Sequence, residues 1–440
     1  MNALARLGTA VDGCINELPM TRVAGHVREV APTHVRVAGL SSHIRLGDRV
    51  SIEEAGRATI GEVVRIDSAA ATVKLFDERA PVGIGALAYR TGALALSPSP
   101  SWKGRVVNAI GAPLDNLGPL VRGERSMPYD VEPPSAMQRS RVEAPLKTGV
   151  RVLDLFTPIC KGQRIGIFAG SGVGKSTLLA MLAGCEGFDT VVVALVGERG
   201  REVREFLEGP LAPNRHRSVV VLATSDESPM MRRLAPQAAL CVAEYFRDRG
   251  ESVLLIVDSV TRYAHAARDV ALAAGEPAVA RGYTPSVFST LPKLLERAGP
   301  GLEGTGSISA VFSVLVDGDD HNDPVADAIR GTLDGHIVLD RAIANEGRFP
   351  AVNVLTSISR LAELAWTPDE RELVRKLRTL IARFEDTRDL RLMGGYHPGS
   401  DPDLDRAVTL TPRIYEALRQ LADAPPSRDA FAELAQAIQG

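Results

Sequence analysis

The sequence predicts a multidomain fold, with a small β-barrel at the N-terminus, an α/β domain in the centre and an α-helical domain at the C-terminus. Its 440 residues are about three times the usual length of one domain. Short alternating apolar runs between glycine and aspartate turns fill the first part of the chain. Apolar runs then alternate with helical patterns, and the last part has helical periodicity alone.

The composition is that of a folded globular chain, with 45% hydrophobic and 24% charged residues. The formal net charge of -3 provides no global positive field that would attract nucleic acid or anionic lipid. The four cysteines are widely scattered and have neither metal-ligand spacing nor the density of a disulfide framework. The apolar runs are too short to span a bilayer, and no signal sequence is recognisable. We therefore expect a cytoplasmic protein.

Residues 1–20 have an apolar stripe at helical spacing, formed by Leu4, Leu7, Val11 and Ile15. This pattern is typical of a helix that docks on a partner, and a frayed terminus is the alternative. Residues 21–95 carry the alternation of short strands and are predicted to form the β-barrel. Barrels that bind single-stranded nucleic acid present stacking aromatics, but this stretch has only Phe76 and Tyr89. A structural or ring-forming role is favoured, without nucleic acid.

Residues 96–365 combine a linker with the α/β domain. The linker is rich in proline, glycine and serine and includes one turn-bounded strand within residues 104–114. The later apolar runs predict a mainly parallel sheet flanked by helices. The last of these runs covers residues 352–359, and we expect it to be a strand that ends at Arg360.

Residues 366–440 are predicted to form the C-terminal helical domain. Thr367 and Glu370 have the spacing of a capping box at the start of its first helix, and Pro368 suits the first turn. The predicted buried face of this helix consists of Leu373, Val374, Leu377, Leu380, Ile381 and Phe384.

A glycine-rich loop follows a predicted strand over residues 163–168 and precedes a helix. Backbone N–H groups of such a loop surround phosphate oxygens, and the helix N-terminus adds positive potential. Lys175 would reach the terminal phosphates, and the Ser176 hydroxyl would ligate Mg²⁺. A dinucleotide fingerprint would need a third glycine where Lys175 stands. The predicted phosphate-binding residues are Ala169, Gly170, Ser171, Gly172, Val173, Gly174, Lys175, Ser176 and Thr177. Ala169 departs from the strict pattern, which has glycine there.

Charged residues follow two further apolar runs. Asp258 ends the run over residues 253–257, and Glu198 comes shortly after the run over residues 191–196. Ligands of parallel sheets lie beyond the carboxyl ends of the strands, so both carboxylates are expected near the phosphates. Asp258 fits a magnesium-holding role, with a helix N-cap as the alternative. Glu198 is the candidate base that orients and deprotonates water, although such a turn in isolation is more often a solvated loop.

Arg360 has two interpretations. A lone arginine at the end of a strand usually forms a surface salt bridge. In a ring, the same side chain could enter the neighbouring subunit's site and neutralise charge in the transition state, an effect of about 10³ to 10⁵ in rate.

Five segments together resemble the rotary ATPase superfamily, and more closely its flagellar and type III secretion export ATPases. They are residues 168–176, 197–203, 258–263, 285–299 and 335–339. The resemblance covers nearly the whole chain. It implies a central P-loop (RecA-like) nucleotide-binding domain and a homohexamer that hydrolyses ATP with Mg²⁺ to energise protein export.

The resemblance also implies roles for individual residues. Its in-chain site corresponds to Lys175, Ser176, Glu198, Arg199, Asp258 and Arg262, and its arginine finger corresponds to Arg360. Phe349 falls where the superfamily places an aromatic ring against adenine, and Tyr396 would complete that pocket.

The implied partners are those of an export ATPase. A stator-like negative regulator would bind the N-terminus, and a stalk-like protein would enter the centre of the ring. The export gate, chaperones and export substrates complete the set, and these partners alone would hold the protein peripherally at the inner face of the cytoplasmic membrane.

Three alternatives to a flagellar export ATPase stay open at this point. An injectisome ATPase of virulence or symbiosis would share the catalysis and differ in its partners. A noncatalytic regulatory subunit of a rotary ATPase would be expected to lack a base such as Glu198. A hexameric RNA helicase on the same core would bind single strands with steep salt dependence.

Overall fold

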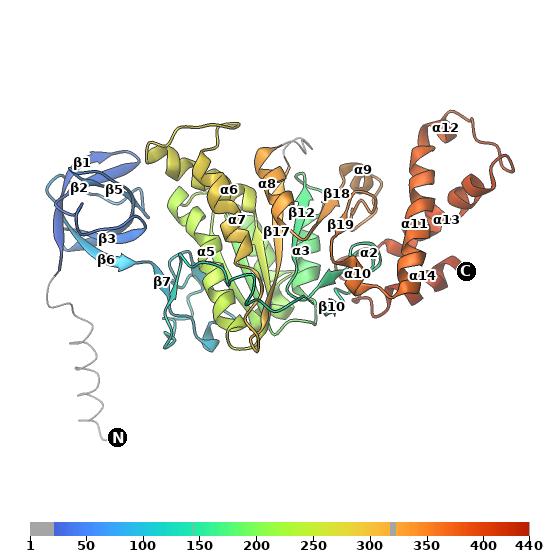
Figure 1. Cartoon of the computed structure of the whole chain (residues 1–440), viewed down its shortest axis with the longest axis horizontal. Helices are drawn as coiled ribbons and strands as arrows, with labels where there is room; N and C mark the ends of the chain where they lie inside the picture. The colour runs from blue at the N-terminus through green and yellow to red at the C-terminus, as the bar shows by residue number, and fades with distance from the viewer. Residues whose placement is uncertain (1–21, 143, 317–322, 440) are drawn as a thin grey trace, which may run out of the picture. The chain divides into compact units, whose positions relative to one another are not determined.

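The structure is a computed structural model, and it divides the chain into two compact units (Figure 1). It describes residues 22–142, 144–316 and 323–439. The expected docking segment, residues 1–20, lies outside the described residues.

The first unit, residues 1–94 with 270–275, contains a closed six-stranded barrel in the order β1-β2-β5-β4-β3-β6. Its strands are β1 (Ala24–Ala31), β2 (His34–Ala38), β3 (Asp48–Glu54), β4 (Arg57–Ile66), β5 (Ala71–Leu75) and β6 (Leu87–Ala93). The hairpin from β3 to β4 turns at Ala55 and Gly56, whose φ angles of 48° and 77° suit a two-residue turn between antiparallel strands. The predicted N-terminal barrel is confirmed.

The second unit, residues 95–269 with 276–440, is built around a nine-stranded sheet. Its order is β19-β18-β12-β17-β15-β13-β14-β8, and β16 pairs with β17. The strands are β8 (Val106–Asn108), β12 (Arg164–Ala169), β13 (Thr190–Val196), β14 (Ser218–Ala223), β15 (Ser252–Asp258), β16 (Gly299–Pro300), β17 (Ser307–Leu315), β18 (Gly335–Leu339) and β19 (Ile358–Ser359). From β18 to β8 the neighbours are parallel, so the carboxyl ends of β12, β13 and β15 share one edge.

Helices cover this sheet, and α5 contacts the three strands β13, β14 and β15. The helices are α2 (Arg151–Phe156), α3 (Lys175–Ala183), α4 (Gly200–Glu208), α5 (Pro229–Arg247), α6 (Val260–Ala273), α7 (Pro285–Glu296), α8 (Pro324–Thr332), α9 (Arg341–Asn345) and α10 (Ala362–Ala365). Burial on both faces explains why β13 is an uninterrupted apolar run rather than an alternating one. The shorter elements are β7 (Ala95–Leu96), η1 (Pro100–Trp102), β9 (Met127–Pro128), β10 (Pro145–Leu146), β11 (Ile159–Cys160) and η2 (Ala212–Arg217).

Two segments of the central region differ from expectation. The predicted strand over residues 352–359 is wrong for most of its length, and only β19 forms at its end. Asn353 accepts hydrogen bonds from the backbone N–H groups of Leu355 (3.1 Å) and Thr356 (3.3 Å), which folds the chain into a turn. The strand expected in the linker is β8, which joins the edge of the sheet parallel to β14.

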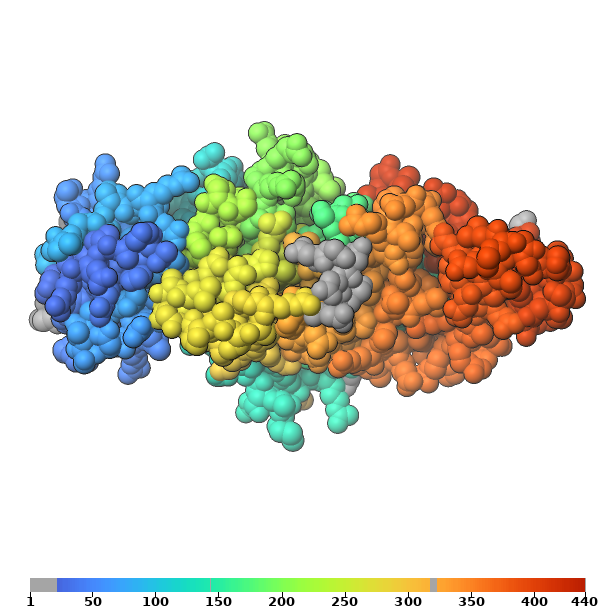
Figure 2. All heavy atoms as spheres, turned by 90° about the horizontal axis from the view of Figure 1, so that it is seen from above, coloured from blue at the N-terminus to red at the C-terminus, as the bar shows by residue number. Residues whose placement is uncertain are grey.

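The C-terminal region is helical, as predicted. Its helices are α11 (Pro368–Asp386), α12 (Arg388–Leu392), α13 (Pro402–Leu418) and α14 (Ala430–Gln439). Thr367 and Glu370 form the capping box of α11. Val374, Leu377 and Ile381 of the predicted face are buried, but Leu373 is 42% exposed. Figure 2 shows these helices in red beside the orange atoms of the α9 region.

Candidate functional site

The phosphate loop occupies residues 170–174, between the end of β12 and the start of α3. Gly172 and Gly174 have φ angles of 78° and 93°, in the left-handed region that favours glycine. Helix α3 begins at Lys175, directly after this turn, so its unpaired backbone N–H groups and its positive dipole end face the loop. The segment therefore has the architecture of an anion site.

Three charged side chains meet beside this loop. The ammonium of Lys175 donates a hydrogen bond to Oδ1 of Asp258, at the end of β15, and lies 3.8 Å from Oε1 of Glu198. Ser313 of β17 donates to the same Asp258 oxygen at 2.9 Å. Asp258 is only 4% exposed and Glu198 9%, so both carboxylates depend on these partners.

Arg262, on the first turns of α6, holds Glu198 from another side. Its Nε lies 3.3 Å from Oε1 of Glu198, and its Nη1 donates to the carbonyl oxygen of Gly197. Burial raises the pKa of Glu198 to about 7, and the nearby charge of Asp258 acts in the same direction. Lys175 and Arg262 oppose this rise. A carboxylate with a pKa near neutrality suits general base chemistry.

A cavity of about 290 Å³ opens beside these groups. Its lining includes Ser176, Glu198 and Asp258, whose side chains carry oxygen atoms, and the apolar residues Val203 and Phe206. Hydroxyl and carboxylate oxygens are the ligands that Mg²⁺ prefers. The donor set around the phosphate loop therefore fits a magnesium ion.

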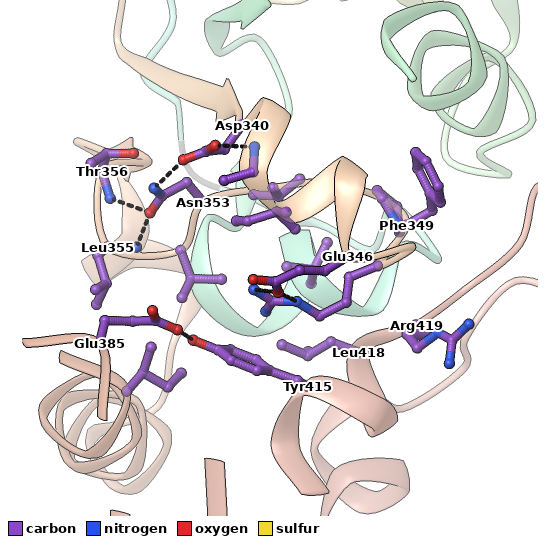
Figure 3. Close-up of a pocket in the computed structure, with 18 of the residues that line it drawn as sticks. Asp340, Glu346, Phe349, Asn353, Leu355, Thr356, Glu385, Tyr415, Leu418 and Arg419 are labelled. Atoms are coloured by element: carbon purple, nitrogen blue, oxygen red, sulfur yellow. Dashed lines mark hydrogen bonds and ion pairs between the residues drawn. The ribbon is translucent and has the colours of Figure 1, made fainter. Parts of the chain in front are cut away.

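Phe349 lies on the other flank of the loop. A Cβ atom at Gly174 would stand 3.4 Å from the Phe349 ring, so the ring is in van der Waals range of the phosphate loop. Phe349 also lines a cavity of about 240 Å³ whose lining includes Arg348 and Tyr415 (Figure 3). Tyr396 is not among the residues that line this cavity, and its hydroxyl donates to Asp405 at 2.7 Å.

Two of the expected arginines lie apart from the Lys175 cluster. The side chain of Arg199 is 76% exposed and lies 3.4 Å from Glu202. Arg360 is exposed directly after β19, the edge strand of the sheet, and its backbone N–H donates to the carbonyl oxygen of Asp334 at 2.9 Å. The described part of the chain thus gathers Lys175, Ser176, Glu198, Asp258 and Arg262 at one site.

Sequence reasoning missed Ser313 and Glu202. Ser313 is a fully buried hydroxyl in β17, the strand inserted between β12 and β15. The sequence feature that could have identified it is a polar residue inside an apolar run, since a buried hydroxyl needs a hydrogen-bond partner. Glu202 lines the cavity with Glu198. Glu202 lies in the first turn of α4, and because Glu198 precedes that helix, helical spacing gave no signal that the two residues share a cavity.

Within the described residues, no helix is both long enough and apolar enough to cross a membrane.

Two family models match the chain. The nucleotide-binding domain of the ATP synthase alpha/beta family matches residues 149–359. The T3SS EscN ATPase C-terminal domain matches residues 366–436.

Curated relatives match nearly the whole length. A flagellum-specific ATP synthase of Agrobacterium fabrum is 59% identical over 94% of this chain and 88% of its own length. A flagellum-specific ATP synthase of Rhizobium meliloti is 55% identical over 99% of this chain and 94% of its own length.

A solved structure has the same fold. The assembled ATPase EscN of the enteropathogenic E. coli type III secretion system superimposes with a TM-score of 0.88 and 38% identity, covering 94% of this chain and all of that chain. EscN in complex with its central stalk EscO superimposes with a TM-score of 0.86 and 37% identity, over the same shares of the two chains.

Proposed function

The chain belongs to the flagellum-specific ATP synthases of the ATP synthase alpha/beta family, and from this premise we propose that it hydrolyses Mg²⁺-bound ATP to energise type III export of flagellar components. The observation that carries the proposal is the meeting of Lys175, Glu198 and Asp258 beside the phosphate loop. This cluster supplies a cation for phosphate and a buried carboxylate for water within one site.

Each residue of the cluster has a physical role in the proposed hydrolysis. The loop N–H groups and Lys175 bind the β- and γ-phosphates. Glu198 orients the attacking water and accepts its proton, and Arg262 holds the carboxylate in place. Ser176 and Asp258 would hold Mg²⁺, which neutralises charge on the phosphate oxygens.

Phe349 and Arg360 extend the site beyond the phosphates. The Phe349 ring, which lies against Gly174, would pack on the adenine of ATP. Arg360 is exposed at the sheet edge and would enter the site of the neighbouring subunit. Arg199 would contact phosphate only after leaving Glu202, and Tyr396 would contribute to the base pocket only after leaving Asp405.

The proposed assembly is a homohexamer with a stalk-like protein at its centre. The assembled EscN structure and its complex with the central stalk EscO support this arrangement. We further propose that residues 1–20 bind a stator-like negative regulator and that the export gate, chaperones and export substrates complete the partners. Through them the protein would lie peripherally at the inner face of the cytoplasmic membrane.

Four experiments test this function. Native mass spectrometry with and without a nonhydrolysable nucleotide should detect a six-subunit species that carries ligand. Pull-downs should then recover flagellar rod and hook proteins rather than injectisome effectors. Strong stimulation of hydrolysis by poly-pyrimidine RNA would instead favour the helicase alternative. Absence of any affinity for Mg²⁺-bound ATP in folded protein would overturn the proposal altogether.

A further inference from the structure

Phe168 lies in β12, two residues before the phosphate loop. It also contacts β18, the strand that pairs with β19, and Arg360 directly follows β19. Its ring is fully buried in β12 and lies edge-on to the imidazole of His336 in β18, with centroids 5.9 Å apart. The Phe168 ring packs directly on the backbone of Gly166, because a Cβ at Gly166 would stand 2.6 Å from a Phe168 ring carbon. The imidazole therefore packs on a rigid surface.

His336 also holds the segment that leads to Arg360. Its Nε2 lies 3.0 Å from the carbonyl oxygen of Thr356, and since a carbonyl oxygen only accepts, the imidazole N–H is the donor. Thr356 is exposed and belongs to the turn that replaces the expected strand. This bond thus fixes an otherwise irregular segment four residues before Arg360.

The rest of the segment packs closely on the backbone of β18. A Cβ at Gly335 would stand 2.5 Å from the carbonyl oxygen of Ile358, so the two backbones are in direct contact. The backbone N–H of Arg360 donates to Asp334 at 2.9 Å. These contacts anchor the backbone of Arg360, and Nε2 of Gln163, the residue before β12, donates to Oγ of Ser359 at 3.0 Å. His336 links the preceding turn at Thr356 to Phe168 in the strand of the phosphate loop.

Arg330 of α8 makes a parallel connection. Its guanidinium lies 4.9 Å from the centroid of the Phe168 ring, and its carbonyl oxygen accepts a long hydrogen bond of 3.5 Å from Nη2 of Arg360. The Phe168 ring is therefore connected to the Arg360 segment both through His336 and through Arg330. The hydrogen bond from His336 to Thr356, at 3.0 Å, is shorter than the bond from Arg360 to Arg330.

We propose that His336 is a positioning residue for Arg360. Its imidazole connects the turn at Thr356 to Phe168 and so holds the backbone before Arg360 in the position from which the guanidinium reaches the neighbouring subunit. This inference rests on the proposed function, because it requires Arg360 to act in the neighbour's site. Misplacement of a catalytic group by about 1 Å costs about 10²-fold in rate. His336→Ala should therefore lower kcat of the assembled ring by about 10²-fold.

Mixed rings distinguish positioning of Arg360 from damage to the subunit's own site. Arg360→Ala leaves the subunit's own Glu198 intact, whereas Glu198→Gln leaves its arginine intact. Mixing these two inactive variants should restore part of the activity, because some sites then receive both groups. His336→Ala should behave as Arg360→Ala does, gaining activity when mixed with Glu198→Gln and gaining none when mixed with Arg360→Ala.

The two failures are distinguishable. If Arg360→Ala and Glu198→Gln do not restore each other, the assignment of Arg360 fails, and the role of His336 fails with it. If that pair restores activity but His336→Ala gains nothing from Glu198→Gln, only the role of His336 is overturned.

Two further substitutions separate the hydrogen bond from the ring contact. His336→Gln retains an N–H donor and should keep most of the activity, whereas His336→Phe retains only a ring and should be as impaired as His336→Ala. Wild-type activity of His336→Phe would contradict the proposal. For every variant, an unchanged Kd for Mg²⁺-bound ATP and an unchanged Tm establish that the subunit is folded.

Discussion

Nζ of Lys175 lies 3.8 Å from Oε1 of Glu198 while it also donates a hydrogen bond to Asp258, so one ammonium serves two buried carboxylates. A bound triphosphate would compete for that ammonium, because its terminal oxygens carry more charge than either carboxylate. Mg²⁺ would then balance Asp258, and Arg262 would stay with Glu198. We therefore expect the charges of the site to be redistributed when ATP binds.

The first prediction concerns the base. Glu198→Gln preserves the shape of the side chain and removes its ability to accept a proton. Hydrolysis should fall by about 10²- to 10⁴-fold, whereas the affinity for Mg²⁺-bound ATP should be retained. Phosphate release and calorimetry measure the two quantities. Glu205→Gln is the matched control in the same cavity; it removes only an exposed ion pair with Arg201 at 3.4 Å and should change turnover little. Near-normal turnover of Glu198→Gln would remove Glu198 as the base.

The second prediction is a pH dependence. The pKa of Glu198 is raised to about 7, and only the ionised carboxylate accepts a proton from water. Below about pH 7 the group is protonated, so kcat/KM should fall about tenfold for each pH unit and should level off above this range. The residual activity of Glu198→Gln should lack this limb. A profile of the wild-type enzyme that stays flat from about pH 5.5 to 7.5 would contradict the assignment.

The sequence predicted the phosphate loop and the two acidic strand ends because each depends on local signals. Glycine allows the positive φ at Gly172 and Gly174, and Lys175 follows at fixed spacing. The order of the strands is not local, and β17 with Ser313 therefore went unrecognised between β12 and β15. The segment over residues 352–359 was predicted as a strand from its apolar content, but the side chain of Asn353 competes for the backbone N–H groups.

Local sequence signals also do not determine which side chains of a helix are buried. The period of α11 predicted Val374, Leu377 and Ile381 as buried, but helical spacing alone could not exclude the neighbouring Leu373, which is 42% exposed. Whether Arg360 serves its own site or another is likewise a property of the assembly. The sequence and the described residues give only its place at the sheet edge.

The third prediction concerns the N-terminal segment. Deletion of residues 1–18 leaves β1, which begins at Ala24, and the ion pair of Arg22 with Glu53 at 2.8 Å. The variant should therefore keep its Tm and lose the stator-like regulator, as measured by calorimetry. Substituting aspartate for Leu4, Leu7 and Val11 should reproduce the loss, and alanine at Arg6 and Thr9 should not. Unchanged regulator binding after the deletion would exclude a docking role.

The fourth prediction tests whether Arg360 acts between subunits. In rings assembled from wild-type subunits and the double variant Arg360→Ala/Glu198→Gln, each variant subunit should disable two sites, its own through Glu198 and its neighbour's through Arg360, with a loss of about 10³- to 10⁵-fold at the neighbour's site. Activity should therefore fall with the square of the wild-type fraction, whereas an arginine that served its own site would give a proportional fall. Steady-state hydrolysis is measured as the variant fraction rises. Arg375→Ala, a matched control that removes an exposed arginine paired with Glu372 at 2.8 Å, should lack this effect. If activity of unmixed Arg360→Ala rings stayed near wild type, the arginine would be a surface residue only.

The fifth prediction concerns the base of the nucleotide. The Phe349 ring lies 3.4 Å from the position of a Cβ at Gly174, and the carbonyl oxygen of Phe349 accepts from the backbone N–H of Gln420 at 2.8 Å. Phe349→Ala keeps this backbone bond and removes only the stacking surface, which contributes about 1–3 kcal/mol per base. The Kd for ATP should therefore rise by roughly 5- to 150-fold, whereas the Kd for inorganic triphosphate should not change. Phe349→Tyr retains the ring and is the control. Equal weakening of both ligands by Phe349→Ala would mean that the ring supports the phosphate loop and does not contact adenine.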